Sequence, residues 1–456
     1  MKLKPRHCLC TALLLLGGVF LSAGRPQFLE TVIPVGSTPL DVAWNPASNK
    51  VYTANSQGGS VTVIDGATNQ VLATVPVADD PTFLCYNSVD NKVYCTTGDP
   101  DWLYVMDGVG DTVIKRVRMR GYPTLMTYNA TMNKLYVLCY DDQMVRVYDG
   151  AADSLVSEVP LGSNPGTLLW HPVTNRVFCS LYGTDSVFTI DCTADQVTER
   201  LAVGRHPYPM CWNPMNGFVY VDSDGGIRVL TANGDSVVDV IAADALCMCF
   251  VPYPDKLYAI ANRTEVIDCA TQVVTDSLAY EGNAVVCDTI RGKVYSAATY
   301  PGQCYVFDAK TDTLLTAISL GTSPQAICWN RTNSRVYIAD AMDGAVYVIR
   351  DTTTGVAEPV IAAVNLSSSM VASPNPFTRT VTIKCGVRLA PGAGIGIFSQ
   401  DGRQVRRLVP GPTLPVSPAT SAWDGRDELG RCVPRGVYLA VVEGQAGVRA
   451  KLVKLD

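Results

Sequence analysis

Histidine and cysteine carry much of the nucleophilic, redox and metal chemistry of proteins, and this chain uses them very unequally. Its 456 residues include 16 cysteines but only three histidines, His7, His171 and His206. No Cys-x-x-Cys-His, Gly-x-Ser-x-Gly or Walker-type motif occurs, and three scattered histidines cannot build a multi-histidine copper site. The sequence therefore predicts no catalytic residue, no metal site and no cofactor.

Most other notable residues follow an internal repeat. Asn49-Lys50-Val51-Tyr52 recurs as Asn91-Lys92-Val93-Tyr94, and divergent copies end at Tyr136, Phe178, Tyr220, Tyr258, Tyr295 and Tyr337. Successive copies are 42 residues apart, except for two spacings of 38 and 37. Each period holds short β-branched and aromatic segments between turns rich in Gly, Pro, Asn and Asp, which is typical of the four-stranded unit of a β-propeller.

The sequence therefore predicts an all-β chain with an eight-bladed β-propeller over residues 29–364. A seven-bladed propeller is the alternative, with the shorter unit at 245–283 serving another purpose. Residues 29–35 resemble the last strand of a unit, Leu72–Val77, although they precede the first unit. We expect them to complete the final blade and to cover its open edge.

Two residue types in the repeat have structural explanations. Cysteine fills one repeat position at Cys85, Cys211, Cys249 and Cys328, where other units have Ala43, Thr127 and Leu169. A position shared with such residues is a buried one, so we expect mostly free, structural thiols. Aspartate ends the third strand of most units, and there we expect it to fix a turn rather than to bind a metal ion.

Strand direction predicts where a binding site would lie. In each unit the first and third strands run one way and the other two run back. The loops that enter the first strand therefore share a face with the loops between the second and third strands. These loops vary between units, whereas the turns of the opposite face are uniform. We predict ligand-binding residues on the variable loops, namely Trp102, Tyr122, Tyr140, Tyr182, His206, Tyr208 and Tyr300. The alternative is ordinary loop variation, with tyrosines packed on their neighbours.

These units resemble the YVTN family of propeller repeats. The match runs through Asn49–Asn55, Val61–Asp65 and Val75–Val77, and the resemblance extends over about residues 29–364. The family includes surface-layer and other extracytoplasmic proteins. At the level of the repeat, the chain is also similar to lactonase-type and cytochrome-associated propellers. The resemblance therefore implies the fold but no single activity.

A second region follows the repeat. Residues 365–372 predict a linker, and the alternating segments of residues 373–456 predict a small immunoglobulin-like β-sandwich. This region resembles the C-terminal sorting domains of type IX secretion cargo and the immunoglobulin-like domain of flagellar hook-capping proteins. The matching residues include Asn375, Pro376, Phe377, Trp423, Asp424, Gly425, Gly436 and Tyr438. The resemblance implies contact with secretion machinery, although Ser399-Gln400 stands where the family usually has Tyr-Asp.

Residues 1–24 predict a signal peptide. Lys2, Lys4 and Arg6 precede the apolar segment Cys8–Phe20, and small residues follow it. No later segment is apolar for long enough to predict a transmembrane span. A net charge of −6 argues against a nucleic acid or an anionic membrane as partner. We expect an exported protein, extracellular or on the outer surface of a bacterium, with the periplasm as the alternative.

The features together predict a secreted or cell-surface protein with a binding or structural role and no enzymatic activity. Its propeller face would recognise a glycan, a peptide or a protein. The alternative is a lactonase-like hydrolase, which buried acids clustered around a metal ion in the central channel would favour.

Overall fold

The computed structural model describes two compact units, Met1–Gly355 and Val356–Asp456. The described residues are 27–98, 100–162, 164–352, 370–373, 377, 379–385, 394–399, 404–408, 420–428, 430–442 and 445–455. The predicted signal peptide, the end of the predicted propeller and most of the predicted linker therefore lie outside them. None of the described residues belongs to a helix long and apolar enough to cross a membrane.

The described part of the first unit forms eight four-stranded antiparallel sheets, numbered here in chain order. Sheets 1–4 comprise β2 (Pro39–Asn45), β3 (Lys50–Asn55), β4 (Ser60–Asp65) and β5 (Val71–Pro76); β6 (Pro81–Asn87), β7 (Lys92–Gly98), β8 (Asp101–Asp107) and β9 (Val113–Arg118); β10 (Pro123–Asn129), β11 (Lys134–Cys139), β12 (Met144–Asp149) and β13 (Ser154–Pro160); and β14 (Pro165–His171), β15 (Arg176–Leu181), β16 (Ser186–Asp191) and β17 (Gln196–Ala202). A single 3₁₀ turn, η1 (Tyr182–Thr184), lies between β15 and β16.

The remaining sheets repeat the pattern with shorter strands in sheets 5 and 6. Sheets 5–8 comprise β18 (Met210–Trp212), β19 (Val219–Val221), β20 (Ile227–Leu230) and β21 (Val237–Ile241); β22 (Cys247–Val251), β23 (Lys256–Ile260), β24 (Thr264–Asp268) and β25 (Val273–Leu278); β26 (Ala284–Asp288), β27 (Lys293–Ala298), β28 (Gln303–Asp308) and β29 (Thr313–Ser319); and β30 (Pro324–Asn330), β31 (Arg335–Asp340), β32 (Ala345–Asp351) and β1 (Gln27–Pro34).

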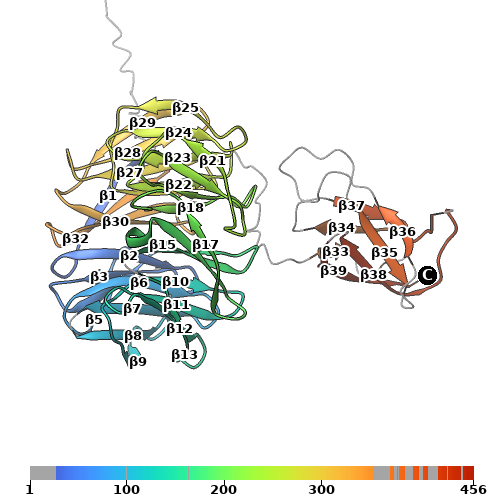
Figure 1. The fold of residues 1–456 in the computed structure, drawn as a ribbon, viewed down its shortest axis with the longest axis horizontal. Helices are drawn as coiled ribbons and strands as arrows, with labels where there is room; N and C mark the ends of the chain where they lie inside the picture. Colours follow the sequence, from blue (N-terminus) through green and yellow to red (C-terminus); the bar gives the residue numbers. More distant parts are fainter. Residues whose placement is uncertain are drawn as a thin grey trace, which may run out of the picture. The chain divides into compact units, whose positions relative to one another are not determined.

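The sheets form a closed ring. The first strand of each sheet contacts the first strands of both neighbouring sheets, and β2 of sheet 1 contacts β30 of sheet 8. Strand β1 pairs antiparallel with β32, from Gln27 opposite Asp351 to Pro34 opposite Ala345. In Figure 1 this blue strand lies beside the orange strands of sheet 8. The prediction that an N-terminal strand completes the last sheet is confirmed, and the strand begins two residues earlier than expected.

The repeated aromatic residues hold neighbouring sheets together. All eight of them are fully buried, at 1% exposure or less. Tyr52, for example, packs in one cluster with Val93, Cys95 and Met106 of sheet 2. Burying one such ring contributes about 2 kcal/mol relative to leaving it exposed. This packing explains why these positions are the most regular part of the repeat.

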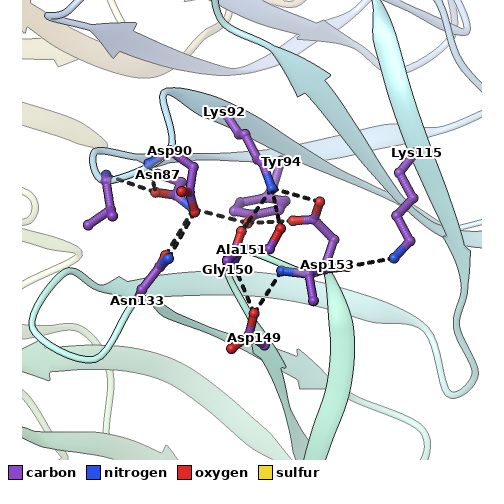
Figure 2. A network of polar contacts seen from close by, with 12 residues as sticks. Asn87, Asp90, Lys92, Tyr94, Lys115, Asn133, Asp149, Gly150, Ala151 and Asp153 are labelled. Carbon is purple, nitrogen blue, oxygen red and sulfur yellow. Dashed lines mark hydrogen bonds and ion pairs between the residues drawn. The ribbon is translucent and has the colours of Figure 1, made fainter.

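A polar network fastens each of several sheets to the next (Figure 2). Lys92 of β7 donates hydrogen bonds to the carbonyl oxygens of Gly150 and Ala151, at 2.9 and 3.1 Å, and forms an ion pair of 2.8 Å with Asp153. The hydroxyl of Tyr94 donates to the Asp153 carboxylate at 3.0 Å. Equivalent ion pairs are Lys50–Asp111, Lys134–Asp195, Lys256–Asp312 and Lys293–Asp351. We call these contacts the latch.

Buried amides add a second connection on the same side of the ring. The Asn45 amide donates to Asn91 of the next sheet at 2.8 Å, and Asn330 of sheet 8 donates to Asn49 of sheet 1 at 2.8 Å. His171 takes the place of the asparagine in sheet 4. Its Nδ1 accepts a hydrogen bond from the Thr174 N–H, so its Nε2 is the donor to the Gly217 carbonyl, 3.0 Å away. Burial lowers the pKa of His171, which keeps the ring neutral in this role.

The explanations for cysteine and aspartate agree with the structure. Thirteen cysteines among the described residues are free. Cys85, Cys211, Cys249 and Cys328 each lie opposite the repeated tyrosine of the adjacent strand. Asp65 accepts hydrogen bonds from the backbone N–H groups of residues 67 and 68, as an aspartate that fixes a turn does.

The second unit is a two-sheet sandwich in its described residues. One sheet has the order β33 (Met370–Ser373), β34 (Val381–Cys385) and β37 (Thr420–Trp423). The other has the order β36 (Gln404–Leu408), β35 (Ile395–Ser399), β38 (Gly436–Val442) and β39 (Gln445–Lys454). Strand β33 begins three residues before the predicted start of this domain. The all-β fold class, a propeller followed by a small sandwich, is confirmed.

Three of the predicted motif residues form the centre of the sandwich. The Trp423 ring lies 5.5 Å from that of Phe377 and 5.0 Å from that of Tyr438, between centroids. The Trp423 indole N–H donates to the Arg426 carbonyl at 2.9 Å, across the turn that holds Asp424 and Gly425. Gly436 begins β38. Asn375 and Pro376 lie outside the described residues.

Candidate recognition face

The loops that enter each first strand and the loops between second and third strands lie on one side of the ring, which we call the loop face. The connection is direct in sheets 1–4. The residue before the strand-opening proline has a positive φ, and its carbonyl accepts a hydrogen bond from the other loop of the same sheet. The donor–acceptor pairs are Ser56–Thr38, Gly98–Asp80, Tyr140–Tyr122 and Tyr182–Asn164, at 2.8 to 3.1 Å.

Most of the predicted binding residues are exposed on this face. The exposed fractions are 40% for Tyr122, 43% for Tyr140, 37% for Tyr182, 40% for Tyr208 and 78% for Tyr300. His206 is also exposed. Tyr122 and His206 both occupy the positive-φ position, with φ of 52° and 54°. Bulky side chains are rare there, and this backbone conformation fixes the direction in which they leave the loop.

Trp102 differs from the prediction. The connection before it is very short, because Gly98 already pairs with Asp101, so Trp102 is the second residue of β8 and not a loop residue. Its half-buried ring is covered by the guanidinium groups of Arg116 and Arg118, 5.1 and 5.2 Å from the ring centroid. Trp102 therefore has its aromatic face occupied by the protein's own cations.

The loops of sheets 4 and 5 bring aromatic and acidic side chains together. The Tyr182 and His206 rings lie 5.6 Å apart between centroids. The His206 Nδ1 atom is 3.2 Å from a carboxylate oxygen of Asp224. Burial raises the pKa of Tyr182, and the nearby Tyr208 and acidic groups of this loop act in the same direction. Three predicted residues, Tyr182, His206 and Tyr208, thus lie in one cluster, which we call the sheet-5 cluster.

Asp222, like Asp224, belongs to this cluster but was not predicted from the sequence. Burial raises its pKa to about 7, and the negative charge of Asp244 in the next loop adds to this effect. Its Oδ1 atom is shielded from water and has no hydrogen-bond partner among the residues that the structure describes. A carboxyl group with this pKa gains its charge near neutral pH, so the charge of the cluster depends on pH.

A second aromatic site lies over sheets 2 and 3. A Cβ atom at Gly98 would come within 2.6 Å of the Tyr122 ring, so the glycine makes room for this side chain. Burial raises the pKa of Tyr122, and the charges of Asp80, Asp141 and Asp101 raise it further. Tyr122 therefore stands among carboxylates, as Tyr182 does. The Tyr140 backbone N–H donates to the Tyr122 carbonyl at 3.1 Å, so Tyr140 adjoins this second site. Tyr300 lies in the loop between β27 and β28 of sheet 7.

Acidic side chains outnumber basic ones on the described loop face. The acids are Asp79, Asp80, Asp141, Asp142, Asp185, Asp222, Asp224, Asp244, Glu281 and Asp343, and the basic residues are Arg120, Arg205 and Arg263. Asp142 is neutralised by Arg146 of β12, at 2.6 Å, and Arg263 pairs with Glu265. The remaining acids give this face a negative potential, which attracts cations.

The lactonase-like alternative would require acidic side chains clustered around a metal ion. Among the described residues, no group of three or more His, Cys, Asp or Glu side chains is arranged to hold a metal ion. Asp41, on the first strand of sheet 1, was not predicted. Its carboxylate accepts hydrogen bonds from the backbone N–H groups of Val42 and Leu84, both at 2.8 Å, and burial raises its pKa to about 6. Asp41 thereby connects β2 to β6.

No protein-family model matches the chain, and no curated protein matches it. Among solved structures, hydrazine synthase of Kuenenia stuttgartiensis is 17% identical, with a TM-score of 0.51 over 70% of this chain and 96% of that one. The Cps50 (Swd1) β-propeller domain of Myceliophteria thermophila is 9% identical, with a TM-score of 0.51 over 71% and 99%. Sqt1 of Saccharomyces cerevisiae is 10% identical, with a TM-score of 0.62 over 71% and 98%. At these identities the similarity concerns the fold alone, and the first unit of this chain is a β-propeller.

Proposed function

We propose that the protein binds a basic peptide or a basic segment of another protein through the loop face. The observation that carries this proposal is the combination of exposed tyrosines with the carboxylates of Asp222 and Asp224 in the sheet-5 cluster. Tyrosine provides contact area at a low cost in side-chain entropy, and a carboxylate beside an aromatic ring favours an ammonium or guanidinium group. Arg116 and Arg118 over Trp102 are an example of this contact within the chain.

Charge is the argument for a basic partner over a glycan. Neutral sugars gain little from a negative potential, whereas Lys- and Arg-rich segments are attracted to it and oriented by it. Acidic groups lie near exposed tyrosines at two places on the loop face, around Tyr122 and around Tyr182. A partner that spans more than one loop would therefore meet aromatic and acidic groups repeatedly.

The test compares three probes on the full-length chain. Calorimetry measures binding of a Lys/Arg-rich peptide, an Asp/Glu-rich peptide of the same length and a neutral oligosaccharide. We expect measurable binding of the basic peptide only. Equal binding of both peptides, or binding of the oligosaccharide alone, contradicts the proposal. Metal-dependent hydrolysis of lactones or esters by the purified chain would replace it with the lactonase-like alternative.

We further propose that the protein is exported and that it acts outside the cytoplasm. The n-region, apolar segment and small residues at 1–24 support a cleaved signal peptide. The YVTN-like repeat and the sorting-domain-like motif around Trp423 support delivery to the cell surface through a type IX secretion system. Mass spectrometry of native protein is expected to find the mature N-terminus near residue 25. Deletion of 370–456 is expected to stop surface delivery; unchanged delivery would favour the plain immunoglobulin-like domain.

A further inference from the structure

The innermost strands of sheets 5–7 hold a group of cysteines that the recognition face does not use. Cys211 lies on β18, Cys249 on β22 and Cys287 on β26. Cys249 is 8% exposed and belongs to a buried cluster against which the half-buried Cys287 packs. The Cys287 thiol donates a hydrogen bond to the carbonyl of Phe250, the residue next to Cys249, at 2.9 Å. The Cys287 thiol lies close enough to raise the pKa of Cys249 well above its ordinary value.

The repeat shows that Cys287 is unusual at its position. Cys287 pairs with Val294, whereas in every other sheet the equivalent residue, which pairs with the residue just before the repeated aromatic, is itself aromatic. These residues are Trp44, Tyr86, Tyr128, Trp170, Trp212, Phe250 and Trp329. Cys249 occupies the position that pairs with the repeated tyrosine, Tyr258. In sheets 6 and 7, therefore, a cysteine at the position opposite the repeated tyrosine has as its neighbour a cysteine at the position that is otherwise aromatic.

We propose that Cys249 and Cys287 form a disulfide bond between the innermost strands of sheets 6 and 7 when the protein meets an oxidising thiol buffer. A small-molecule disulfide such as oxidised glutathione is the oxidant. The Cys287 thiolate attacks it, forms a mixed disulfide and releases one glutathione thiolate. The Cys249 thiolate then attacks the Cys287 sulfur and releases the second. Two protein thiols lose two protons and two electrons, and one glutathione disulfide becomes two glutathione thiols.

Exposure sets the order of the two attacks. Cys287 is half-buried, whereas Cys249 is buried, and the neighbouring Cys287 thiol together with burial raises the pKa of Cys249. The oxidant therefore reaches Cys287 first, and the closely placed Cys249 resolves the mixed disulfide. Cys211 also lies near Cys287 and could compete with Cys249 for the mixed disulfide. Cys211 belongs to sheet 5, however, and Phe250 of sheet 6 contacts both cysteines. Export into an oxidising compartment, as proposed above, would supply the conditions for this reaction.

The test uses the full-length chain. Protein kept reduced is exposed to a glutathione redox buffer, quenched with acid, alkylated when denatured and mapped by mass spectrometry. We expect Cys249 and Cys287 to lose alkylation together and to appear in one disulfide-linked peptide pair. Cys328 is the matched control, because it shares the repeat position of Cys249 but packs in one cluster with Trp44 instead of a second cysteine. Full alkylation of Cys249 and Cys287 after prolonged exposure, or equal linkage of Cys287 to Cys211, overturns the proposal.

Two variants make the order of steps testable. Cys249→Ala places at this position the residue that sheet 1 already has at Ala43, so the fold should tolerate it. This variant should accumulate glutathione on Cys287, because the resolving thiol is gone. Cys287→Ser should leave Cys249 fully alkylated under the same conditions. An unmodified Cys287 in the Cys249→Ala variant, or a disulfide at Cys249 in the Cys287→Ser variant, contradicts the proposed sequence of attacks.

Discussion

The two faces of the propeller use the same residue types for opposite purposes. On the face of the uniform turns, Asp153 is buried and paired with Lys92, and the equivalent latch recurs between other sheets. On the loop face, the Asp224 side chain is 55% exposed, and the arginine nitrogen nearest its carboxylate, on Arg205, is 4.0 Å away. The first face is constrained by ring closure, because each turn must fit the next sheet. The loops are free of that constraint, and this freedom allows them to differ from sheet to sheet.

The largest effect is expected on stability, from a substitution that breaks the latch. Asp153→Ala leaves the Lys92 ammonium and the Tyr94 hydroxyl without their partner in a buried site, so we expect the free energy of unfolding to fall by about 3 kcal/mol. Asp224→Ala on the loop face should change it by about 0.5 kcal/mol or less. Chemical denaturation of both variants measures the difference. Equal effects would mean that the two faces do not differ in this way.

Removal of exposed rings should affect binding and not stability. Replacing Tyr122, Tyr182 and Tyr208 together by Ala is expected to weaken binding of the basic peptide by about 2 kcal/mol, or about thirtyfold. The control replaces Val89, Val173 and Ile290, which are exposed on turns of the opposite face, by Ala. The control should bind normally. Unfolding of the tyrosine variant would show that these rings belong to the core, and the recognition site would then be elsewhere.

Salt concentration is expected to affect peptide binding on the loop face more than it affects the ion pairs of the opposite face. Exposed carboxylates on the loop face are screened, so binding of the basic peptide should weaken about tenfold between about 0.05 M and about 0.5 M salt. The buried Lys92–Asp153 pair is screened much less. Calorimetry in both buffers, with denaturation curves at the same salt concentrations, tests this point. Binding that is insensitive to salt would remove charge from the explanation.

The smallest effect concerns pH. Because the pKa of Asp222 is raised to about 7, its carboxyl is neutral below that pH and negative above it. Binding of the basic peptide should therefore strengthen about threefold from pH 6 to pH 8. Asp222→Asn should remove this increase, whereas His206→Gln, which removes the neighbouring imidazole, should retain it. An unchanged pH profile in Asp222→Asn would exclude Asp222 from the binding site.

Periodic contacts could be predicted from the sequence, and contacts between different loops could not. Tyr52 and its equivalents indicated the sheets because each packs in the same way against the next sheet. The segment at 29–35 indicated ring closure because it resembles the last strand of a unit but precedes the first unit. The approach of Tyr182 to His206 and the environment of Asp222 depend on loops of three sheets, and no repeat encodes them. Trp102 was misplaced for the same reason, since a shortened loop moved it into β8. Asp41 gave only a weak signal, as a charged residue on a first strand.

Closure of the ring by β1 also determines how the propeller would bear a mechanical load. The segment that leads to the second unit leaves the described propeller after β32, which pairs with β1 on one side and β31 on the other. A pull on the C-terminal unit therefore loads a central strand through two ladders of hydrogen bonds at once, with Gln27 and Asp351 bonded at the point where force enters. If the sandwich anchors the protein to a surface, the strand that carries the load is paired on both sides and is not a free edge strand.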